Sequence, residues 1–151
     1  MHFDPNNNIV KLCAQGMQLE GQGKAKEAFD LFNFAWTLAT NDLEKFTAAH
    51  YVARHQDNTT DKLKWDIISL TYALKVGDTE TSDIMPSLYL NIAKCYEDLN
   101  ELEQALENYR LGFSFVTDDM ADGYPKMIKI GLTAGLTRTL AKYGKTEETN
   151  R

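Results

Sequence analysis

The feature that most constrains the fold is the stretch from residue 86 to residue 119, where apolar and small residues recur in steps of three and four. This is the period of an amphipathic helix. The pattern is interrupted once, at residues 99–101, which leave room only for a tight turn between two helices. The stretch therefore predicts an antiparallel helix pair that approaches closely at its small residues. The residues of the shared face are Tyr89, Ile92, Ala93, Tyr96, Leu102, Ala105, Tyr109 and Gly112.

This spacing resembles the tetratricopeptide repeat, a helix pair with a period of about 34 residues. Two residues depart from the family pattern, because Asn100 stands where a turn Gly is usual and Thr117 where a Pro is common. Neither departure disturbs the packing of the two helices. The aromatic, aliphatic and small positions that match the repeat are Tyr89, Ile92, Ala93, Tyr96, Ala105, Tyr109 and Gly112.

The resemblance implies an all-α fold, a right-handed α–α superhelix of about three helix pairs closed by a C-terminal capping helix. The first helix of each pair would line a concave face. The resemblance does not specify a function, since such repeats bind many unrelated partners.

Two more pairs and a last helix fit the same scheme and place the whole chain, residues 1–151, in one domain. The pair at 9–42 repeats the pattern, whereas the pair at 43–76 fits it only with a few extra residues. A polar connector at 77–85 sets the third pair, at 86–119, 77 residues after the first. The capping helix is expected at about 124–143. The repeat positions matched in the first pair are Gly16, Gly23, Ala28, Phe32 and Ala35.

Polar residues and a glycine predict where several helices begin and end. Asn100 is expected to cap the second helix of the third pair, with Glu103 completing a capping box. Asn41 and Thr60 are expected to cap the two helices of the middle pair. Gly144 is expected to end the capping helix.

Charge and composition limit the classes of partner. The 151 residues include 16 basic and 22 acidic side chains, which give a net charge of −6. Nucleic acid and anionic membranes select for a basic face, so neither is expected as the main partner. The chain has no apolar run long enough to span a bilayer, and its first ten residues lack a secretory pattern. We therefore expect a cytoplasmic protein whose two cysteines are reduced and semi-buried.

The sequence contains none of the short motifs that mark common enzyme or cofactor sites. It has no phosphate-binding loop, no dinucleotide-binding glycine motif and no nucleophile elbow. His50 and His55 are five residues apart rather than four, so on a helix they point about 140° apart. We therefore expect no metal site, no cofactor and no enzymatic activity.

Six polar or aromatic residues are candidates for contacts with a peptide or protein. His50 and Arg54 share one helix face, Tyr51 lies on the next, and an Arg beside aromatic rings suits an acidic segment. The alternative for this group is that Tyr51 packs between helix pairs and Arg54 pairs with a nearby acid such as Asp57 or Asp61.

Asn91 and Lys94 share a helix face that could equally be a solvated surface. Tyr124 could close one end of the groove, although its neighbourhood also suits a simple helix cap. The six candidates are His50, Tyr51, Arg54, Asn91, Lys94 and Tyr124.

These observations favour a non-catalytic scaffold that binds a protein or peptide on its concave face. The first alternative is a self-assembling homodimer, because the aromatic residues exceed what the repeat pattern needs. A remote alternative is a small hydrolase or transferase that would use His50, His55 and Asp57. The aromatic residues behind the homodimer interpretation are Phe29, Phe34, Phe113 and Phe115.

Overall fold

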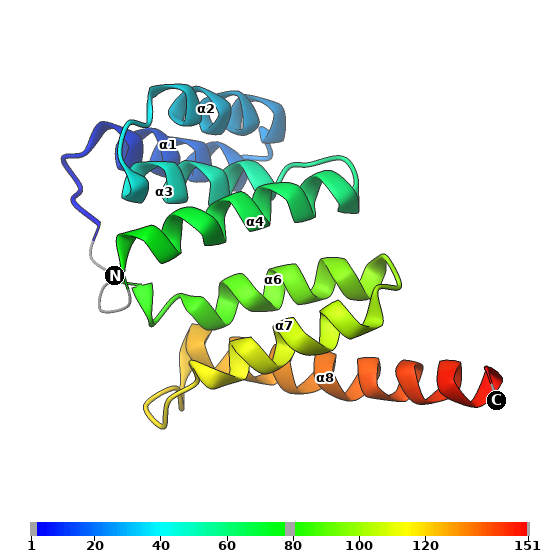
Figure 1. Ribbon diagram of the computed structural model, residues 1–151. Coiled ribbons are helices and arrows are strands. Elements are labelled where there is room, and N and C mark those ends of the chain that lie inside the picture. The colour runs from blue at the N-terminus through cyan, green and yellow to red at the C-terminus, as the bar shows by residue number, and fades with distance from the viewer. Residues whose placement is uncertain (1–2, 78–80, 151) are drawn as a thin grey trace. The chain divides into compact units, whose positions relative to one another are not determined.

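The computed structural model describes residues 3–77 and 81–150, and this part of the chain is all-α, with seven helices and no strand. It divides into two compact units, Met1–Thr81 and Ser82–Arg151, which we describe separately as unit 1 and unit 2. Unit 1 contains α1 (Asn8–Gly21), α2 (Ala25–Leu38), α3 (Asp42–Ala53) and α4 (Thr59–Val76) (Figure 1). Unit 2 contains α6 (Met85–Asp98), α7 (Leu102–Ser114) and α8 (Gly123–Thr149).

Unit 1 is an antiparallel helix pair, α1 and α2, on which α3 packs, followed by α4 against α3 (Figure 1). Phe32 of α2 is fully buried at the centre of this packing. On one side it meets Gly16 of α1, where an added Cβ would lie 2.3 Å from the Phe32 ring. On another side Tyr51 of α3 stacks on it, with the ring centroids 5.1 Å apart. A glycine is therefore required on α1 because the neighbouring helix fills that space with an aromatic ring.

Unit 2 repeats this arrangement with α6 and α7 as the pair and α8 as the third helix (Figure 1). Its core contains Tyr109, which is fully buried, beside Leu132 of α8. An added Cβ at Gly112 would lie 2.7 Å from a Leu132 methyl group, and one at Gly135 would lie 2.3 Å from the Tyr109 ring. Gly112 also faces α6, because its added Cβ would lie 3.3 Å from the Tyr89 Cβ. This predicted small residue therefore lies where α6 and α7 approach, although its nearest neighbour is on α8.

The turn between α6 and α7 corrects one prediction, because Asn100 ends α6 instead of capping α7. Asn100 has a φ of +60°, and its backbone N–H donates to the Glu97 carbonyl at 3.0 Å. The N–H of Glu101 donates to the Tyr96 carbonyl at 2.9 Å. These two bonds form a Schellman motif, in which a left-handed residue satisfies the last carbonyl groups of a helix. Asn adopts this conformation more readily than most residues, so it replaces the usual Gly.

The turn between α1 and α2 has the same geometry. Gly23 has a φ of +76° and donates to the Glu20 carbonyl at 3.0 Å, while Lys24 donates to the Leu19 carbonyl at 2.8 Å. Gly23 and Asn100 are 77 residues apart, the same interval that separates the two pairs in the sequence. The two helix pairs therefore share their turn as well as their packing pattern.

Other helix ends agree with the predictions in part. Asn41 caps α3, as expected, and does so through a capping box with Glu44. The cap of α4 is Asn58, whose side chain accepts from the Asp61 N–H at 2.8 Å, and not Thr60. The last helix is longer than 124–143, since α8 begins at Gly123 and continues through Gly144 to Thr149. A helix tolerates an exposed glycine at a cost of about 1 kcal/mol, so Gly144 does not have to end it.

The two cysteines lie one in each unit, Cys13 on α1 and Cys95 on α6, and both are buried. Burial raises the pKa of the Cys13 thiol to about 12, so it stays protonated at neutral pH. Among the described helices, none combines the length and the apolar character that crossing a bilayer would require.

Candidate functional site

Three of the six candidate residues, His50, Tyr51 and Arg54, lie together at the C-terminal end of α3 in unit 1. The His50 ring is close to the rings of Phe46 and Tyr51, with centroids 6.3 Å and 5.4 Å away. Its Nδ1 atom is buried and has no hydrogen-bond partner in the described part of the chain. Burial lowers the pKa of His50 to about 4, helped by the positive charges of Arg54 and Lys62. His50 is therefore neutral at physiological pH.

Tyr51 and Arg54 have structural roles at this end of α3. Tyr51 stacks on Phe32 of α2, and the Arg54 guanidinium lies 5.5 Å from the centroid of the Tyr51 ring. Arg54 donates to a carboxylate oxygen of Glu20 on α1 at 3.0 Å. Tyr51 therefore packs between helices, as the structural alternative predicts. Arg54 pairs with an acid, as that alternative also predicts, but the acid is Glu20 of α1 and not Asp57 or Asp61. The Arg54 side chain remains 44% exposed, so it still presents a cation to solvent.

The two histidines of the enzymatic interpretation have different surroundings. His55 contacts the rings of Phe29 and Phe32, with centroids 6.1 Å and 5.6 Å away. Its Nε2 atom lies 3.3 Å from the Glu20 carboxylate. His50 instead contacts Phe46 and Tyr51, as described above.

The other three candidates lie in unit 2, on α6 and α8. Lys94 forms an ion pair with Asp98, one turn further along α6, and Asn91 on the same helix is half-buried. Tyr124, in the first turn of α8, is 64% exposed. The six candidates are thus divided between the two units. Tyr124 is more exposed to solvent than Arg54 or Lys94, whose side chains are 44% and 49% exposed.

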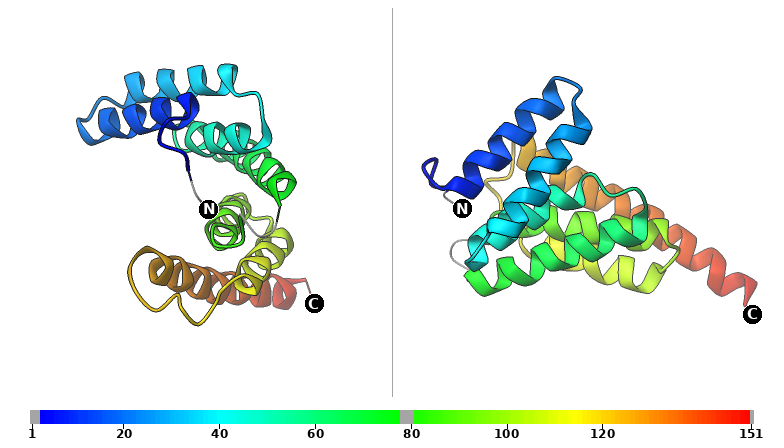
Figure 2. Two further views of the ribbon diagram at one scale, coloured as in Figure 1. Left: turned by 90° about the vertical axis from the view of Figure 1, so that its left-hand side faces the viewer. Right: turned by 90° about the horizontal axis from the view of Figure 1, so that it is seen from above.

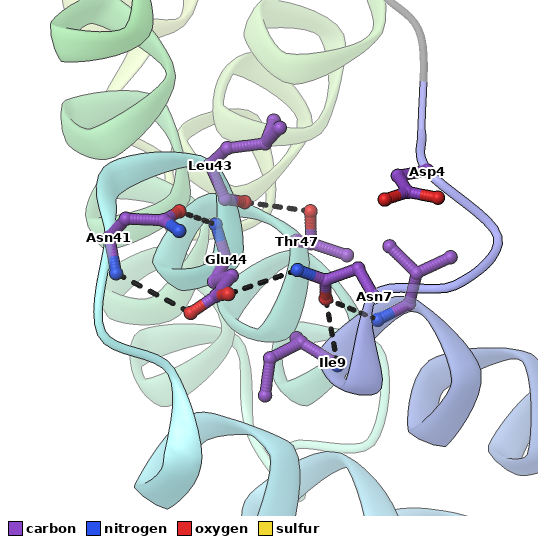
Figure 3. A pocket seen from close by; sticks show the side chains of 8 residues that line it. Asp4, Asn7, Ile9, Asn41, Leu43, Glu44 and Thr47 are labelled. Atoms are coloured by element: carbon purple, nitrogen blue, oxygen red, sulfur yellow. Dashed lines mark hydrogen bonds between the residues drawn. The ribbon is translucent and has the colours of Figure 1, made fainter.

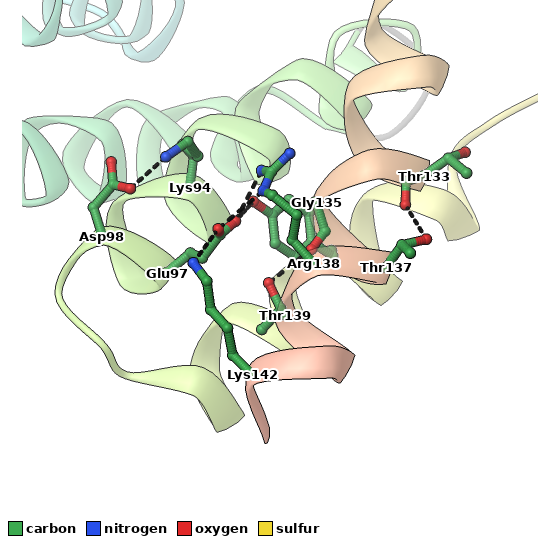
Figure 4. Close-up of polar contacts among 10 residues, drawn as sticks. Lys94, Glu97, Asp98, Thr133, Gly135, Thr137, Arg138, Thr139 and Lys142 are labelled. Carbon is green, nitrogen blue, oxygen red and sulfur yellow. Dashed lines mark hydrogen bonds and ion pairs between the residues drawn. The ribbon is translucent and has the colours of Figure 1, made fainter. Parts of the chain in front are cut away.

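An ion cluster around the buried carboxylate of Glu97, which the sequence patterns do not predict, joins all three helices of unit 2. Figure 4 shows its members on α6 and α8. Glu97 of α6 is only 4% exposed. It accepts two hydrogen bonds from Arg138 of α8, at 3.1 Å and 2.9 Å, and one from Lys142 at 2.7 Å. The Tyr109 hydroxyl of α7 donates to it at 2.7 Å. The sequence signal was a basic pair four residues apart on α8 and an acid at an inward position of α6.

The charge state of Glu97 follows from these contacts. Burial alone would raise the pKa of its carboxyl group. The hydrogen bonds from Arg138, Lys142 and Tyr109 outweigh burial and hold that pKa well below its usual range. The same cluster raises the pKa of Tyr109, by burial first and then by its bond to Glu97. The cluster is therefore an ion pair that holds α8 against α6 and α7.

A hollow of about 50 Å³ lies in unit 1 between the start of α1 and the start of α3 (Figure 3). Its central group is Glu44, which accepts from the Asn7 side chain at 3.0 Å and from the Thr40 N–H at 2.8 Å. The bond from the Thr40 backbone, followed by that from Asn7, lowers the pKa of Glu44. Asn7 in turn caps α1 by accepting from the Ile9 and Val10 N–H groups. The polar groups here serve the helix ends, which explains the hollow without a ligand.

The most distinctive exposed surface in unit 2 is on α8. Three bulky apolar side chains there are largely in solvent, namely Tyr124 at 64%, Met127 at 67% and Ile130 at 57%. A hollow of about 440 Å³ adjoins Ile130. Of these three residues, only Tyr124 is among the six candidates from the sequence. The sequence signal for the other two is the step of three from Met127 to Ile130. The hollow is lined by Met120, Ala121, Lys126, Lys129, Ile130, Thr133 and Ala134.

Within residues 3–77 and 81–150, no group of three or more His, Cys, Asp or Glu side chains is placed to hold a metal ion. Comparison with protein-family models, curated proteins and solved structures gives no match for this chain. The tetratricopeptide resemblance therefore rests on the residues and turns described above.

Proposed function

We propose that this chain is a binding module that holds a protein or peptide partner on its helix surfaces and performs no chemistry of its own. The observation that carries this proposal is the exposed apolar surface of α8, where Tyr124, Met127 and Ile130 are 57–67% exposed. Large apolar side chains grouped on the surface of a well-packed helical unit mark an interaction surface.

We also propose that the helix pairs are of the tetratricopeptide type. Support comes from the close approaches at Gly16 and Gly112 and from the Schellman turns at Gly23 and Asn100. The right-handed superhelix with a concave binding face, which the family resemblance implies, belongs to the same proposal. Scaffolds of this kind present a preformed surface, so they lose little conformational entropy when a partner binds.

Affinity capture from a native lysate tests the binding function. The wild type is compared with a Met127→Asp/Ile130→Asp variant of α8 and with Arg54→Ala in unit 1. Tyr51 is left intact because it stacks on Phe32 and its loss would disturb the core. Lys26→Ala is the control, since the Lys26 side chain is 92% exposed.

The expected result is a partner that is captured by the wild type and the control and lost from one of the two surface variants. Circular dichroism establishes that each variant is folded. If all four proteins recover the same proteins in equal amounts, neither surface binds a partner and the proposal fails.

Self-association is the second candidate, and α2 is the surface that favours it. Phe34 is 51% exposed and Leu38 is 46% exposed on this helix. Phe29, Phe113 and Phe115 do not add to this surface, since all three are partly buried. Sedimentation velocity on wild type and Phe34→Glu tests the idea, because a dimer formed here would dissociate in the variant. A wild type that remains monomeric at high concentration contradicts it.

A further inference from the structure

The last helix, α8, has two faces that suit contact with other helices, and unit 2 uses one of them. Figure 2 shows α8, in orange to red, packed beside α6 and α7. Its inner face buries Leu132, Gly135 and Thr139. A second series in steps of four and three follows the outer face, and all its members are exposed. This is the spacing at which side chains of one helix contact another. The outer series is Met127, Ile130, Ala134, Thr137 and Ala141.

The outer face has large side chains at one end and small ones further along. Met127 and Ile130 stand out from the helix near its start, and Ala134 and Ala141 leave the backbone accessible beyond them. The hollow of about 440 Å³ is lined by Ile130 and reaches Ala134. Its volume is in the range of sites that accept a bulky group from a partner. The shape therefore suits another helix that lies along α8 and inserts an apolar side chain near Ile130.

The charge of α8 indicates the chemistry of that helix. All five basic side chains of α8 lie within residues 123–145, where there is no acidic one, and its two acidic residues, Glu147 and Glu148, are in the last turn. The whole chain, in contrast, has a net charge of −6. Arg138 and Lys142 are engaged by Glu97. Lys126 and Lys129 line the hollow, and neither forms an ion pair with a residue that the structure describes.

We propose that the outer face of α8 docks an acidic amphipathic helix of a partner protein. Its apolar side chains contact Met127 and Ile130, with one of them in the hollow, and its carboxylates pair with Lys126 and Lys129. The acidic residues that precede α8 in the sequence, including Asp122, disfavour further acids at that end. The partner's acids therefore extend from Lys126 toward Lys129 and not toward Asp122. This inference rests on the proposed binding function and names its surface and partner class.

A second copy of the chain fits this face less well. Two α8 helices paired through residues 127–141 of their outer faces would bring together segments that carry only basic residues, because the acidic Glu147 and Glu148 lie beyond them. Like charges that meet across an interface oppose association. The same argument favours a partner helix with carboxylates beside its apolar stripe.

A display library of amphipathic helices tests the proposal with the full-length protein as bait. The library fixes Leu at helical spacing and varies the flanking positions among Glu, Lys and Ser. Peptides enriched on the wild type are then titrated, by fluorescence anisotropy, against Lys126→Glu/Lys129→Glu and against Ile130→Asp. The control is Lys24→Glu/Lys26→Glu, which makes the same charge change on an exposed part of unit 1.

Glu-rich peptides are the expected selection. Their dissociation constant is expected to rise at least about 10-fold in the α8 charge-reversal variant and in Ile130→Asp, and to change by less than about 2-fold in the control. Selection on Lys126→Glu/Lys129→Glu is expected to enrich Lys-rich peptides instead.

Four results would overturn the inference. Peptides that bind wild type and both α8 variants equally would place binding on another surface, and the general binding function would survive. A Lys-rich selection on the wild type, or a wild-type dimer that Ile130→Asp dissociates, would exclude the acidic partner. If no peptide is enriched and the lysate capture finds no partner either, the inference and the binding function both fail.

Discussion

Two glycines of α8 differ in the space that surrounds them, and this difference gives a test at the residue scale. A Cβ at Gly135 would lie 2.3 Å from the Tyr109 ring, whereas a Cβ at Gly144 would meet nothing within 4 Å. We expect Gly135→Ala to lower the free energy of unfolding by about 1–3 kcal/mol, because the buried ring must move. Gly144→Ala is expected to raise it by up to about 1 kcal/mol, since Ala favours the helix.

Urea denaturation followed by circular dichroism measures both changes. Because the two substitutions are identical and lie on one helix, helix propensity cancels in their comparison. Equal effects of the two substitutions would show that Tyr109 does not fill the space over Gly135.

Glu97 gives a second test at this scale, because its buried carboxylate accepts four hydrogen bonds from three residues, Tyr109, Arg138 and Lys142. Glu97→Gln is expected to lower the free energy of unfolding at pH 7 by about 1–3 kcal/mol. This loss is smaller than for a fully buried ion pair, because the side chains of Arg138 and Lys142 are each about half exposed. Glu107→Gln, on the exposed side of α7, is the control and is expected to have little effect.

The pH dependence of this difference has a definite sign. The folded-state pKa of Glu97 is held below its ordinary value of 4.5, so the unfolded chain binds more protons in acid. The stabilisation is therefore complete above about pH 4.5 and is lost as the pH falls further. Urea titrations between pH 7 and pH 2.5 should bring wild type and Glu97→Gln closer together in acid. A constant difference across this range would contradict the ion-pair assignment.

At the scale of elements, Glu44 connects the starts of α1 and α3. It completes the capping box with Asn41 and accepts a hydrogen bond from Asn7, the cap of α1. We expect Glu44→Ala to lower the free energy of unfolding by about 1–2 kcal/mol, because both caps lose a partner. Glu27→Ala in the first turn of α2 should cost only a few tenths, since there the acid acts mainly on the helix dipole.

The two free energies come from urea denaturation under identical conditions. If Glu44→Ala costs no more than Glu27→Ala, the hydrogen bonds of the capping box do not contribute measurably.

The sequence predicted the helices well because their apolar spacing is local information. The turn at Asn100 was assigned to the wrong helix, because an Asn can either cap a start or adopt a left-handed end. The predicted end of the last helix is also wrong, because Gly144 suits a C-cap in the sequence but α8 continues to Thr149. Such ends depend on small differences in free energy that spacing does not reveal.

The candidate site was predicted less well, because contacts between helices decide the role of a polar residue. Arg54 and Tyr51 were identified as a pair of interest, but their partners are Glu20 on α1 and Phe32 on α2. Glu97 was missed because an acid in an amphipathic pattern is normally assigned to solvent. Its burial depends on Arg138, which is 41 residues further along the chain.

For the molecule as a whole, stability is expected to fall in mild acid through His50. The folded-state pKa is about 4 and the ordinary value is 6.5, so the unfolded chain binds more protons between these values. Stability is then fully present above about pH 6.5 and falls as the pH is lowered toward 4. We expect a loss of about 1–2 kcal/mol between pH 7 and pH 5 from this residue. This window lies above the one expected for Glu97.

Tryptophan fluorescence separates this effect from events in unit 2. Both tryptophans, Trp36 and Trp65, lie in unit 1, and so does His50. The two tryptophan rings have centroids 5.1 Å apart. In His50→Gln the fluorescence-detected unfolding should lose its dependence on pH between 7 and 5, whatever its midpoint. If the slope persists, another group titrates in this range and His50 is not responsible.

The two buried cysteines make the native chain resistant to thiol-reactive reagents, because only an accessible thiolate reacts. Each unit contains one of them, Cys13 in unit 1 and Cys95 in unit 2. Alkylation of the folded protein therefore has to wait until the unit that holds the cysteine opens. Peptide mapping by mass spectrometry after timed alkylation would give two separate rates, one for each unit. A cysteine introduced on the surface could also be dye-labelled selectively while both natural cysteines remain in place.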